Sequence, residues 1–314
     1  MKIIITGVAG FIGSNLAKKL LRNGCQVIGF DNFITGNRDN LKALQQSENF
    51  SFYEHDVIYP IHNLIGDQEI DWIMHFASPA SPKKYLKFPI ETLRVNCEGT
   101  YQLLELARQK KARFFFTSTS EVYGDAKVYP QPENYWGNVN PNGPRSVYDE
   151  AKRYAESLTL AYHEVNQVST RLIRIFNTYG PNMDLADGRV VINFVIQALK
   201  NQPITIYGDG TQTRSFQYID DLIAGILRFM EVEFYQPINI GNTEEYSILE
   251  IAEIIKELTG SRSDILFCPL PTDDPYRRKP DISLAKEVLK WEPQVSLQEG
   301  LSKIISWVKT VMSN

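Results

Sequence analysis

A tyrosine and a lysine at helical spacing could take a proton from an alcohol. Tyr148 and Lys152 lie in "YDEAK", and on a helix the i, i+4 spacing places both side chains on one face. An ammonium beside a phenol favours the phenolate and lowers the tyrosine pKa from its reference value of about 10. A tyrosine tuned in this way can act as a general base near neutral pH. By itself, such a pair is more often an ordinary surface pair on a helix.

Three hydroxyls and a carboxylate follow an apolar run that is typical of a buried strand. "RFFF" (113–116) leads into "TSTSEVYG" (117–124), so that Thr119, Ser120 and Glu121 lie where the strand should end. Hydroxyl donors at this place suit a developing oxyanion. The structural alternative is a polar strand end with a glutamate that caps the following helix.

A glycine loop lies between a predicted strand and a predicted helix. "TGVAGFIG" places Gly7, Gly10 and Gly13 at G-x-x-G-x-x-G spacing. Such glycines allow a tight turn and a close approach of a pyrophosphate to the backbone, opposite the N–H groups of the helix. Asp31 ends the next strand, where a carboxylate can accept both ribose hydroxyls and would repel a 2′-phosphate. The sequence therefore predicts NAD as the cofactor, and the charge of its oxidised nicotinamide would further favour the phenolate.

Strands and helices alternate through the first half of the chain. Apolar positions at helical spacing predict helices over 11–24, 90–110 and 146–166. This alternation predicts an α/β fold, a doubly wound parallel sheet (Rossmann) with helices on both faces. The predicted strands of this part are 2–6, 26–31, 50–56, 71–77, 112–118 and 169–177.

After Pro181 the alternation becomes irregular. Short predicted strands, 204–208 and 237–241, mix with helices. We therefore expect a Rossmann domain over 1–178 and a smaller C-terminal substrate-binding lobe over 179–314. Some later segments, about 214–242, are expected to return to the first domain.

The composition is that of an ordinary soluble protein. The 314 residues are 43% hydrophobic and 22% charged with a net charge of −4, which argues against a nucleic-acid or membrane-surface partner. Three cysteines without CxxC spacing and four scattered histidines argue against disulfides and against a metal site. The chain begins directly on a predicted strand, and we expect a cytoplasmic location.

Taken together, the glycine loop, Asp31, the hydroxyl strand end and the Tyr-Lys pair resemble the extended short-chain dehydrogenase/reductase superfamily, over essentially the whole chain. The pattern looks closest to one branch, the UDP-glucuronate decarboxylases (UDP-xylose synthases). The stretches that carry this resemblance are "ASPASP" (77–82), "TSTSEVYGD" (117–125), "ENYWGNVNPNGPRSVYDEAKR" (133–153), "RIFNTYGP" (174–181), "DGRVVINF" (187–194), "YGDGTQTRSFQY" (207–218) and "RRKPDI" (277–282).

The resemblance implies a reaction: NAD-dependent oxidation at sugar C4, loss of CO₂ from the 4-keto acid, and re-reduction to UDP-xylose. Thr119 would bind the substrate hydroxyl, Tyr148 would be the base, and Lys152 would also hold the nicotinamide ribose. Arg278 would orient the substrate carboxylate or deliver a proton, by way of a water because an isolated guanidinium is a poor acid. The implied catalytic residues are Thr119, Ser120, Glu121, Tyr148, Lys152 and Arg278.

The resemblance also implies two sets of binding residues. The cofactor-binding set is Gly7, Gly10, Phe11, Ile12, Gly13, Asp31, Asn32, Phe33, Thr35, Gly36, Asp56, Val57, Ala77, Tyr148 and Lys152. The set for a UDP-sugar is Ala80, Tyr85, Arg145, Asn177, Arg189, Thr205, Tyr207, Gln212, Arg214 and Arg278.

Related activities remain as alternatives. Sugar 4,6-dehydratases resemble this chain but carry Asp-Glu where it has Ser120-Glu121, and a serine cannot do the acid work of that aspartate. A UDP-glucuronate 4-epimerase shares the substrate and the first step, and other NAD-dependent nucleotide-sugar epimerases or dehydratases share the chemistry at C4. A non-catalytic NAD-binding regulator commonly lacks the pair that Tyr148 and Lys152 form.

Two further expectations come from the resemblance. Asn182 follows "YGP" where the family usually has arginine, so a charge contact made by that arginine is in doubt. We also expect a homodimer, in which helices 90–110 and 146–166 of two copies pack into a four-helix bundle.

Overall fold

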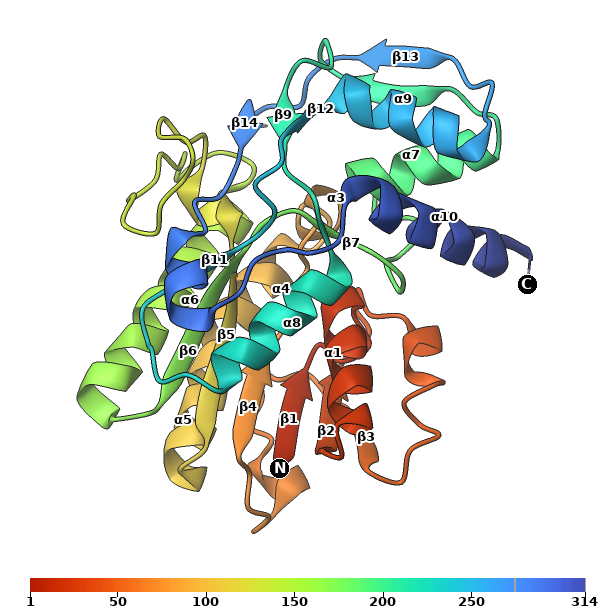
Figure 1. Ribbon diagram of the computed structural model, residues 1–314. Coiled ribbons are helices and arrows are strands. Elements are labelled where there is room, and N and C mark those ends of the chain that lie inside the picture. The colour runs from red at the N-terminus through yellow and green to blue at the C-terminus, as the bar shows by residue number, and fades with distance from the viewer. Residues whose placement is uncertain (274, 314) are drawn as a thin grey trace.

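A parallel sheet forms the centre of the molecule. The computed structural model describes residues 1–273 and 275–313, and within them seven parallel strands pair in the order β11-β6-β5-β4-β1-β2-β3 (Figure 1). This arrangement confirms the predicted doubly wound fold. The seven strands are β1 (Lys2–Thr6), β2 (Gln26–Asp31), β3 (Phe50–Glu54), β4 (Trp72–His75), β5 (Arg113–Thr119), β6 (Thr170–Ile175) and β11 (Ile238–Ile240).

Helices cover both faces of this sheet (Figure 1). One face carries α1 (Phe11–Arg22) and α8 (Ile219–Met230), which contact each other. The other carries α4 (Pro89–Arg94), α5 (Thr100–Lys110) and α6 (Ser146–Asn166). The sheet is therefore buried on both sides, which explains its continuous apolar strands such as "KIIIT" and "RFFF".

The helix predicted over 90–110 contains a π-helical turn, Val95–Gly99, between α4 and α5. Such single π-helical turns inside an α-helix are rare and often lie at functional sites. The buried His75 contacts this one: its Nε2 lies 3.3 Å from the Val95 carbonyl, while Thr6 Oγ1 lies 2.8 Å from its Nδ1. Burial, with the charge of Lys152, lowers the His75 pKa to about 3, which keeps the ring neutral with a single N–H. Helical spacing alone does not reveal this contact.

The second half of the chain builds a smaller lobe above the carboxyl ends of the sheet (Figure 1). Its helices α7 (Val190–Leu199), α9 (Ile248–Thr259) and α10 (Leu297–Ser313) pack on one another. β11 leaves this half and pairs with β6 at the edge of the main sheet. The remaining helices are α2 (His62–Ile65) and α3 (Pro82–Tyr85). The remaining strands are β7 (Thr178–Tyr179), β8 (Ile204–Tyr207), β9 (Thr213–Arg214), β10 (Gln217–Tyr218), β12 (Tyr246–Ser247), β13 (Ile265–Cys268) and β14 (Arg277–Arg278).

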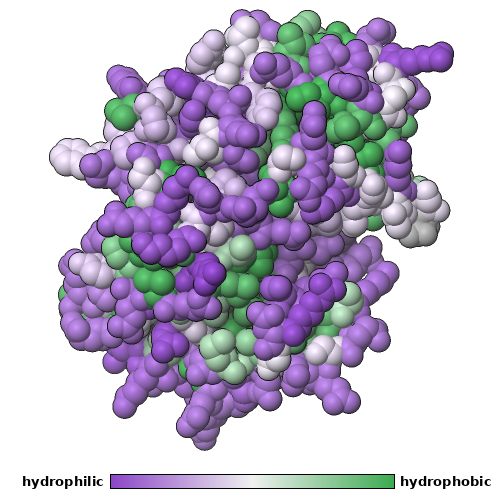
Figure 2. Space-filling model, in the orientation of Figure 1, coloured by the Kyte–Doolittle hydropathy of each residue, from purple (hydrophilic) through white to green (hydrophobic). Residues whose placement is uncertain are grey.

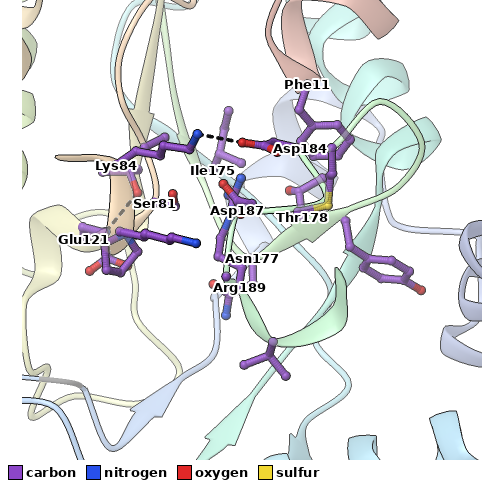
Figure 3. A pocket seen from close by; sticks show the side chains of 18 of the residues that line it. Phe11, Ser81, Lys84, Glu121, Ile175, Asn177, Thr178, Asp184, Asp187 and Arg189 are labelled. Atoms are coloured by element: carbon purple, nitrogen blue, oxygen red, sulfur yellow. Dashed lines mark hydrogen bonds and ion pairs between the residues drawn. The ribbon is translucent and has the colours of Figure 1, made fainter. Parts of the chain in front are cut away.

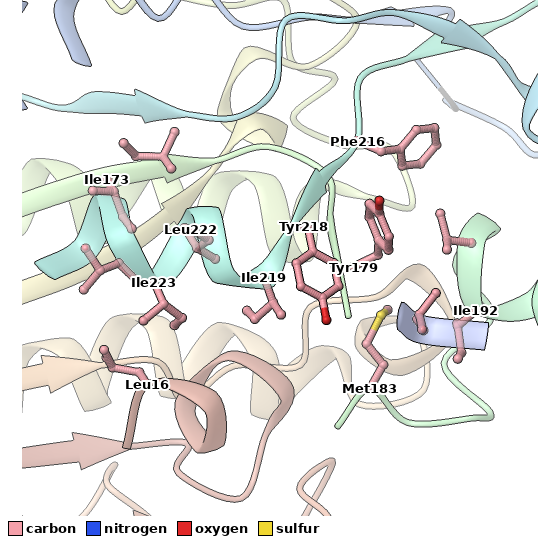
Figure 4. Close-up of a cluster of buried hydrophobic side chains, with 14 of the residues drawn as sticks. Leu16, Ile173, Tyr179, Met183, Ile192, Phe216, Tyr218, Ile219, Leu222 and Ile223 are labelled. Carbon is pink, nitrogen blue, oxygen red and sulfur yellow. The ribbon is translucent and has the colours of Figure 1, made fainter. Parts of the chain in front are cut away.

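One hydrophobic cluster runs from the sheet into the smaller lobe (Figure 4). It joins Leu16 of α1 and Leu222 of α8 to Ile192 of α7, with Tyr179 and Tyr218 between them. This continuous core holds the lobe on the sheet, so that residues from both halves of the chain face one cleft. The surface seen in Figure 2 is mostly hydrophilic, and its hydrophobic side chains lie in separate patches. Among the described residues, no helix has the length and apolar character needed to cross a membrane.

Phe115 at the centre of the sheet offers a test of this packing. Its side chain is 0% exposed and contacts the rings of Trp72, Phe76 and Phe229. We expect Phe115→Ala to lower the free energy of unfolding by about 3–5 kcal/mol, because it leaves a cavity in a close-packed core. Urea unfolding measures the change. Leu266→Ala, at a side chain that is 51% exposed, is the control, and an equal loss in both variants would contradict the packing described here.

Candidate active site

The glycine loop forms a cradle at the start of α1. Gly7 has a φ of 69°, and a Cβ there would lie 2.7 Å from the Ala77 nitrogen, so only glycine fits. A Cβ on Gly13 would collide with the Gly7 carbonyl. Because α1 begins at Phe11, the unpaired N–H groups of its first turn face this loop, as a pyrophosphate requires.

Asp31 lies beside the glycine loop at the end of β2. Its Oδ2 accepts from the Ala9 N–H at 2.9 Å, and its Oδ1 accepts from the Phe33 N–H at 2.8 Å. Burial raises the pKa of Asp31, although these two hydrogen bonds act in the opposite direction. Each carboxylate oxygen keeps a lone pair for a further donor, so the loop and Asp31 fit the dinucleotide that the sequence predicts.

The predicted cofactor residues fall into two adjoining cavities. A small one lies next to Asp31, and a large one of about 590 Å³ extends from the glycine loop to the smaller lobe. Phe33 lines neither, because its ring packs on Phe52 and under the guanidinium of Arg38. The small cavity is lined by Gly7, Gly10, Asp31, Asn32, Thr35, Gly36, Asp56, Val57 and Ala77. The large cavity is lined by Gly7, Gly10, Phe11, Ile12, Gly13, Thr35, Tyr148 and Lys152.

The predicted catalytic and substrate residues all line the large cavity. They come from the segment after β4 with α3, the end of β5, the start of α6, the end of β6 and the smaller lobe. These residues are Ala80, Tyr85, Thr119, Ser120, Glu121, Arg145, Tyr148, Lys152, Asn177, Arg189, Thr205, Tyr207, Gln212, Arg214 and Arg278.

Tyr148 and Lys152 lie on the buried face of α6. Lys152 Nζ donates to the Thr117 carbonyl at 2.8 Å and lies 5.8 Å from the centre of the Tyr148 ring. On its other side the Tyr148 ring stacks on Tyr85, nearly parallel, with centroids 5.1 Å apart. The helix and the stacked ring hold the phenol at one place in the cavity.

The protein's own groups do not lower the pKa of this tyrosine. Burial, followed by the negative charge of Glu121, raises the Tyr148 pKa, which differs from the lowering expected from Lys152. The physical reason is that the phenol itself is buried beside a negative charge, and both disfavour the phenolate. Burial also lowers the Lys152 pKa to about 7, which weakens the opposing effect of the lysine near neutral pH.

Glu121 lies between two guanidinium groups. Its Oε2 is 2.5 Å from Arg145 and its Oε1 is 2.6 Å from Arg278. Burial would raise the pKa of Glu121, but the charges of Arg145 and Arg278 outweigh it and lower the pKa to about 2. The carboxylate is therefore ionised at every physiological pH. Arg278 also donates to Ser120 Oγ at 3.1 Å. One guanidinium therefore contacts both Ser120 and Glu121 at the end of β5.

A bridge across the cavity was not predicted from the sequence. Lys84 Nζ in α3 pairs with Asp184 at 2.7 Å (Figure 3), and Lys83 donates to the Ala186 carbonyl at 3.1 Å. These lysines follow "ASPASP", but nothing in the sequence indicates that 184–186 lies opposite them. Figure 3 also shows Arg189 beside Asp187, its ion-pair partner.

Asn182 lies in the loop that follows β7. It has a φ of 71°, a conformation that asparagine adopts more readily than most residues. Its side chain donates to Ser14 Oγ at 3.2 Å, and its carbonyl accepts from Asn40 at 3.1 Å. Asn182 thus ties the loop after β7 to the glycine-loop helix through neutral hydrogen bonds.

Comparison with known proteins agrees with this geometry. The family model described as GDP-mannose 4,6 dehydratase matches residues 4–304. The chain belongs to this family. Within the family, UDP-glucuronic acid decarboxylase 1 of Arabidopsis thaliana is 51% identical over 306 residues, which cover 98% of this chain and 69% of that protein.

Solved structures of the family have the same fold. The UDP-glucose 4-epimerase of Thermotoga maritima, solved with UDP-glucose, has a TM-score of 0.93 at 30% identity, covering 99% of this chain and 100% of that one. The UDP-glucuronic acid 4-epimerase of Bacillus cereus, solved with UDP-glucuronic acid and NAD, has a TM-score of 0.88 at 32% identity with the same coverage.

Asp149, next to Tyr148, provides a pH test of this site. Burial, followed by the charge of Glu121, raises its pKa to about 8. The folded-state pKa of Asp149 lies above its usual value of 3.8. The protonated carboxyl therefore stabilises the fold fully below pH 3.8, and this contribution is lost as the pH rises through about 8. Asp149→Asn cannot ionise. We therefore expect the wild type to lose more stability than Asp149→Asn between about pH 5 and about pH 8.

Urea unfolding of both proteins at the two pH values measures this difference. Glu150→Gln, at a partly exposed carboxylate of the same helical turn, is the control. Equal losses in wild type and Asp149→Asn would show that the buried carboxyl is ionised in the folded protein.

Proposed function

We propose that this chain is a UDP-glucuronate decarboxylase, an NAD-dependent enzyme that converts UDP-glucuronate to UDP-xylose and CO₂. The observation that carries this proposal is the ionised Glu121, held by Arg145 and Arg278 beside Tyr148 and Ser120. A dehydratase needs an acid where this chain has Ser120. The half-identical decarboxylase of Arabidopsis supports the same reaction.

The first step in the proposed mechanism removes hydrogen from C4 of the sugar. Tyr148 takes the proton of the C4 hydroxyl, and Thr119 hydrogen-bonds the same oxygen. NAD, held by the glycine loop, Asp31 and Lys152, would supply the hydride acceptor for C4 and later the hydride donor. Lys152, held by the Thr117 carbonyl, binds the nicotinamide ribose. In its protonated form it also stabilises the phenolate of Tyr148.

The second step breaks the C5–C6 bond. The 4-keto acid is a β-keto acid, so its carboxylate leaves as CO₂ and the bonding pair becomes an enolate whose charge rests on the C4 oxygen. Thr119 and Ser120 hydroxyls stabilise that oxyanion. Arg278 orients the substrate carboxylate, and the negative Glu121 nearby favours its loss as a neutral molecule.

The third step adds a proton to C5 and closes the cycle. A guanidinium is a poor acid because its pKa exceeds about 12. We therefore propose that a water held by Glu121 and Arg278 delivers the C5 proton, and that a proton taken up from solvent converts the resulting hydroxide back to water. Tyr148 then returns its proton to the C4 oxygen as C4 is reduced, which gives UDP-xylose and leaves the protein in its starting form.

The smaller lobe supplies groups for the rest of the UDP-sugar. Arg189 and Arg214 are the proposed partners of the diphosphate, because guanidinium groups bind its oxygens in a bidentate manner. Tyr85 and Ala80 lie toward the sugar. The run from Thr205 to Gln212 would surround the nucleoside, with Tyr207 near the base and Asn177 at the junction with the sheet.

A 4-epimerase of the same acid sugar is the second candidate. The specific observation in its favour is the likeness to the Bacillus cereus enzyme, which was solved with UDP-glucuronic acid and NAD. Both reactions begin with oxidation at C4, and they differ in whether the carboxylate is then lost. The Bacillus cereus epimerase is 32% identical to this chain, well below the 51% of the Arabidopsis decarboxylase.

The purified protein with UDP-glucuronate and NAD⁺ tests the proposed function. We expect release of CO₂ and formation of UDP-xylose, measured by mass analysis of the products. Tyr148→Phe lacks the base, and we expect it to lose about 10²–10⁴-fold in rate. UDP-galacturonate without CO₂ would instead identify an epimerase. Unchanged turnover in Tyr148→Phe would contradict the assigned base.

We also propose a cytoplasmic homodimer. Free Cys25, Cys97 and Cys268 suit a reducing compartment. Exposed apolar side chains on the three helices of one sheet face support the dimer through the expected four-helix bundle. These side chains are Ile90 of α4, Tyr101 of α5, and Tyr154 and Val165 of α6.

Light scattering tests the dimer. We expect the mass of two chains, and we expect Tyr154→Glu to shift the protein toward monomer because it buries a charge in the interface. Leu266→Glu is the matched control, since Leu266 is 51% exposed and Tyr154 is 49% exposed. A wild-type monomer would contradict this assembly.

A further inference from the structure

Arg278 reaches the site from a short strand whose side chains alternate. β14 pairs with β9, with Arg277 opposite Thr213 and Arg278 opposite Arg214. Successive side chains of a strand point to opposite faces. Arg278 accordingly points inward and is 1% exposed, whereas Arg277 points outward to Glu245. A shift of this strand by one residue would replace one arginine by the other at Glu121.

Gln131 holds the segment that directly follows β14. The Gln131 N–H donates to the Lys279 carbonyl at 2.9 Å, and its own carbonyl accepts from the Asp281 N–H at 2.9 Å. Its side-chain Oε1 accepts from the Lys279 N–H at 2.8 Å. Gln131 is 0% exposed, so these bonds are shielded from water. They fix the position along the chain of the segment that follows Arg278.

Glu245 holds the outward-pointing side chains. Its Oε1 lies 2.5 Å from Arg277 Nε and its Oε2 lies 2.7 Å from Arg277 NH2. Lys279 approaches the same carboxylate at 3.8 Å, and Thr213 Oγ1 donates to it at 2.5 Å. The carboxylate therefore binds both β14 and its partner β9, and it does so only when Arg277 and Lys279 face outward.

We propose that Gln131 and Glu245 are positioning residues for the decarboxylation step, because together they set the register of β14 and so aim Arg278 at the site. Neither side chain lines the large cavity. Their effect passes through Arg278, which donates to Ser120 Oγ at 3.1 Å and to the Gly124 carbonyl at 3.2 Å while it pairs with Glu121. This inference rests on the proposed function.

The separation of the two steps makes the proposal specific. Oxidation at C4 depends on Tyr148 and Lys152, which α6 holds independently of β14. Loss of CO₂ depends on Arg278, and the rate of such a step depends steeply on the placement of the group that orients the substrate. Loosening β14 therefore slows the second step and leaves the first unchanged, so the 4-keto acid and the reduced nicotinamide accumulate.

Two variants of the full-length holoenzyme test this prediction. Glu245→Gln removes the charge that binds Arg277 and Lys279 but keeps an acceptor for Thr213. Gln131→Met keeps the backbone bonds and the side-chain length but removes the acceptor for the Lys279 N–H. The measurements are single-turnover formation of reduced nicotinamide, by absorbance, and release of CO₂ from UDP-glucuronate.

In both variants we expect CO₂ release to slow about 10-fold, as loss of a hydrogen bond or charged pair predicts, with nicotinamide reduction at the wild-type rate. Trp291→Phe is the matched control, because it removes one buried hydrogen bond, to the Asp221 carbonyl at 3.0 Å, away from β14. It should leave both rates unchanged.

The outcomes separate the two proposals. If nicotinamide reduction and CO₂ release slow by the same factor in the variants, or if neither slows, Gln131 and Glu245 have only a structural role and the inference is wrong. If the wild type reduces its nicotinamide but releases no CO₂, the proposed function itself fails.

Discussion

A carboxylate held between two guanidinium groups connects the parts of this molecule. Glu121 follows β5, Arg145 precedes α6, and Arg278 comes from β14. A buried charge is tolerated only when it is paired, and removing one partner from such a group costs about 3–5 kcal/mol. The ionised Glu121 therefore requires both arginines in place. The same contacts that satisfy this charge bring the sheet, the helix that carries Tyr148 and the smaller lobe to one cavity.

Charge in the cavity is arranged by burial as much as by proximity. Burial lowers the Lys152 pKa to about 7 and raises the Asp149 pKa to about 8, while the arginines lower the Glu121 pKa to about 2. The two neighbouring carboxyl groups of Glu121 and Asp149 thus differ in protonation near neutral pH. In the proposed reaction, the carboxylate of the acid sugar would compete with Glu121 for Arg145 and Arg278, which already share the Glu121 carboxylate. Loss of CO₂ would relieve that competition.

Local patterns predicted the elements and most of the candidate site. Continuous apolar strands and amphipathic helices gave bounds within a few residues of the structure, because burial on both faces of the sheet imposes those patterns. Residues joined by short-range geometry, such as Tyr148 with Lys152 or Gly7 with Gly13, could be grouped from spacing alone. Phe33 was predicted at the cofactor but packs on Phe52, since sequence does not show which way a loop side chain turns.

The sequence by itself determined the fold class, the cofactor cradle and the Tyr-Lys pair, because each depends on residues close together in the chain. The tertiary structure decided which distant residues meet. Arg278 reaches Glu121, Lys84 meets Asp184, and Glu245 binds Arg277 only after the second half of the chain folds over the sheet. The tertiary structure also decided the protonation of Tyr148, Lys152 and Asp149. Burial and the field of distant charges set those pKa values, and neither is written in local spacing.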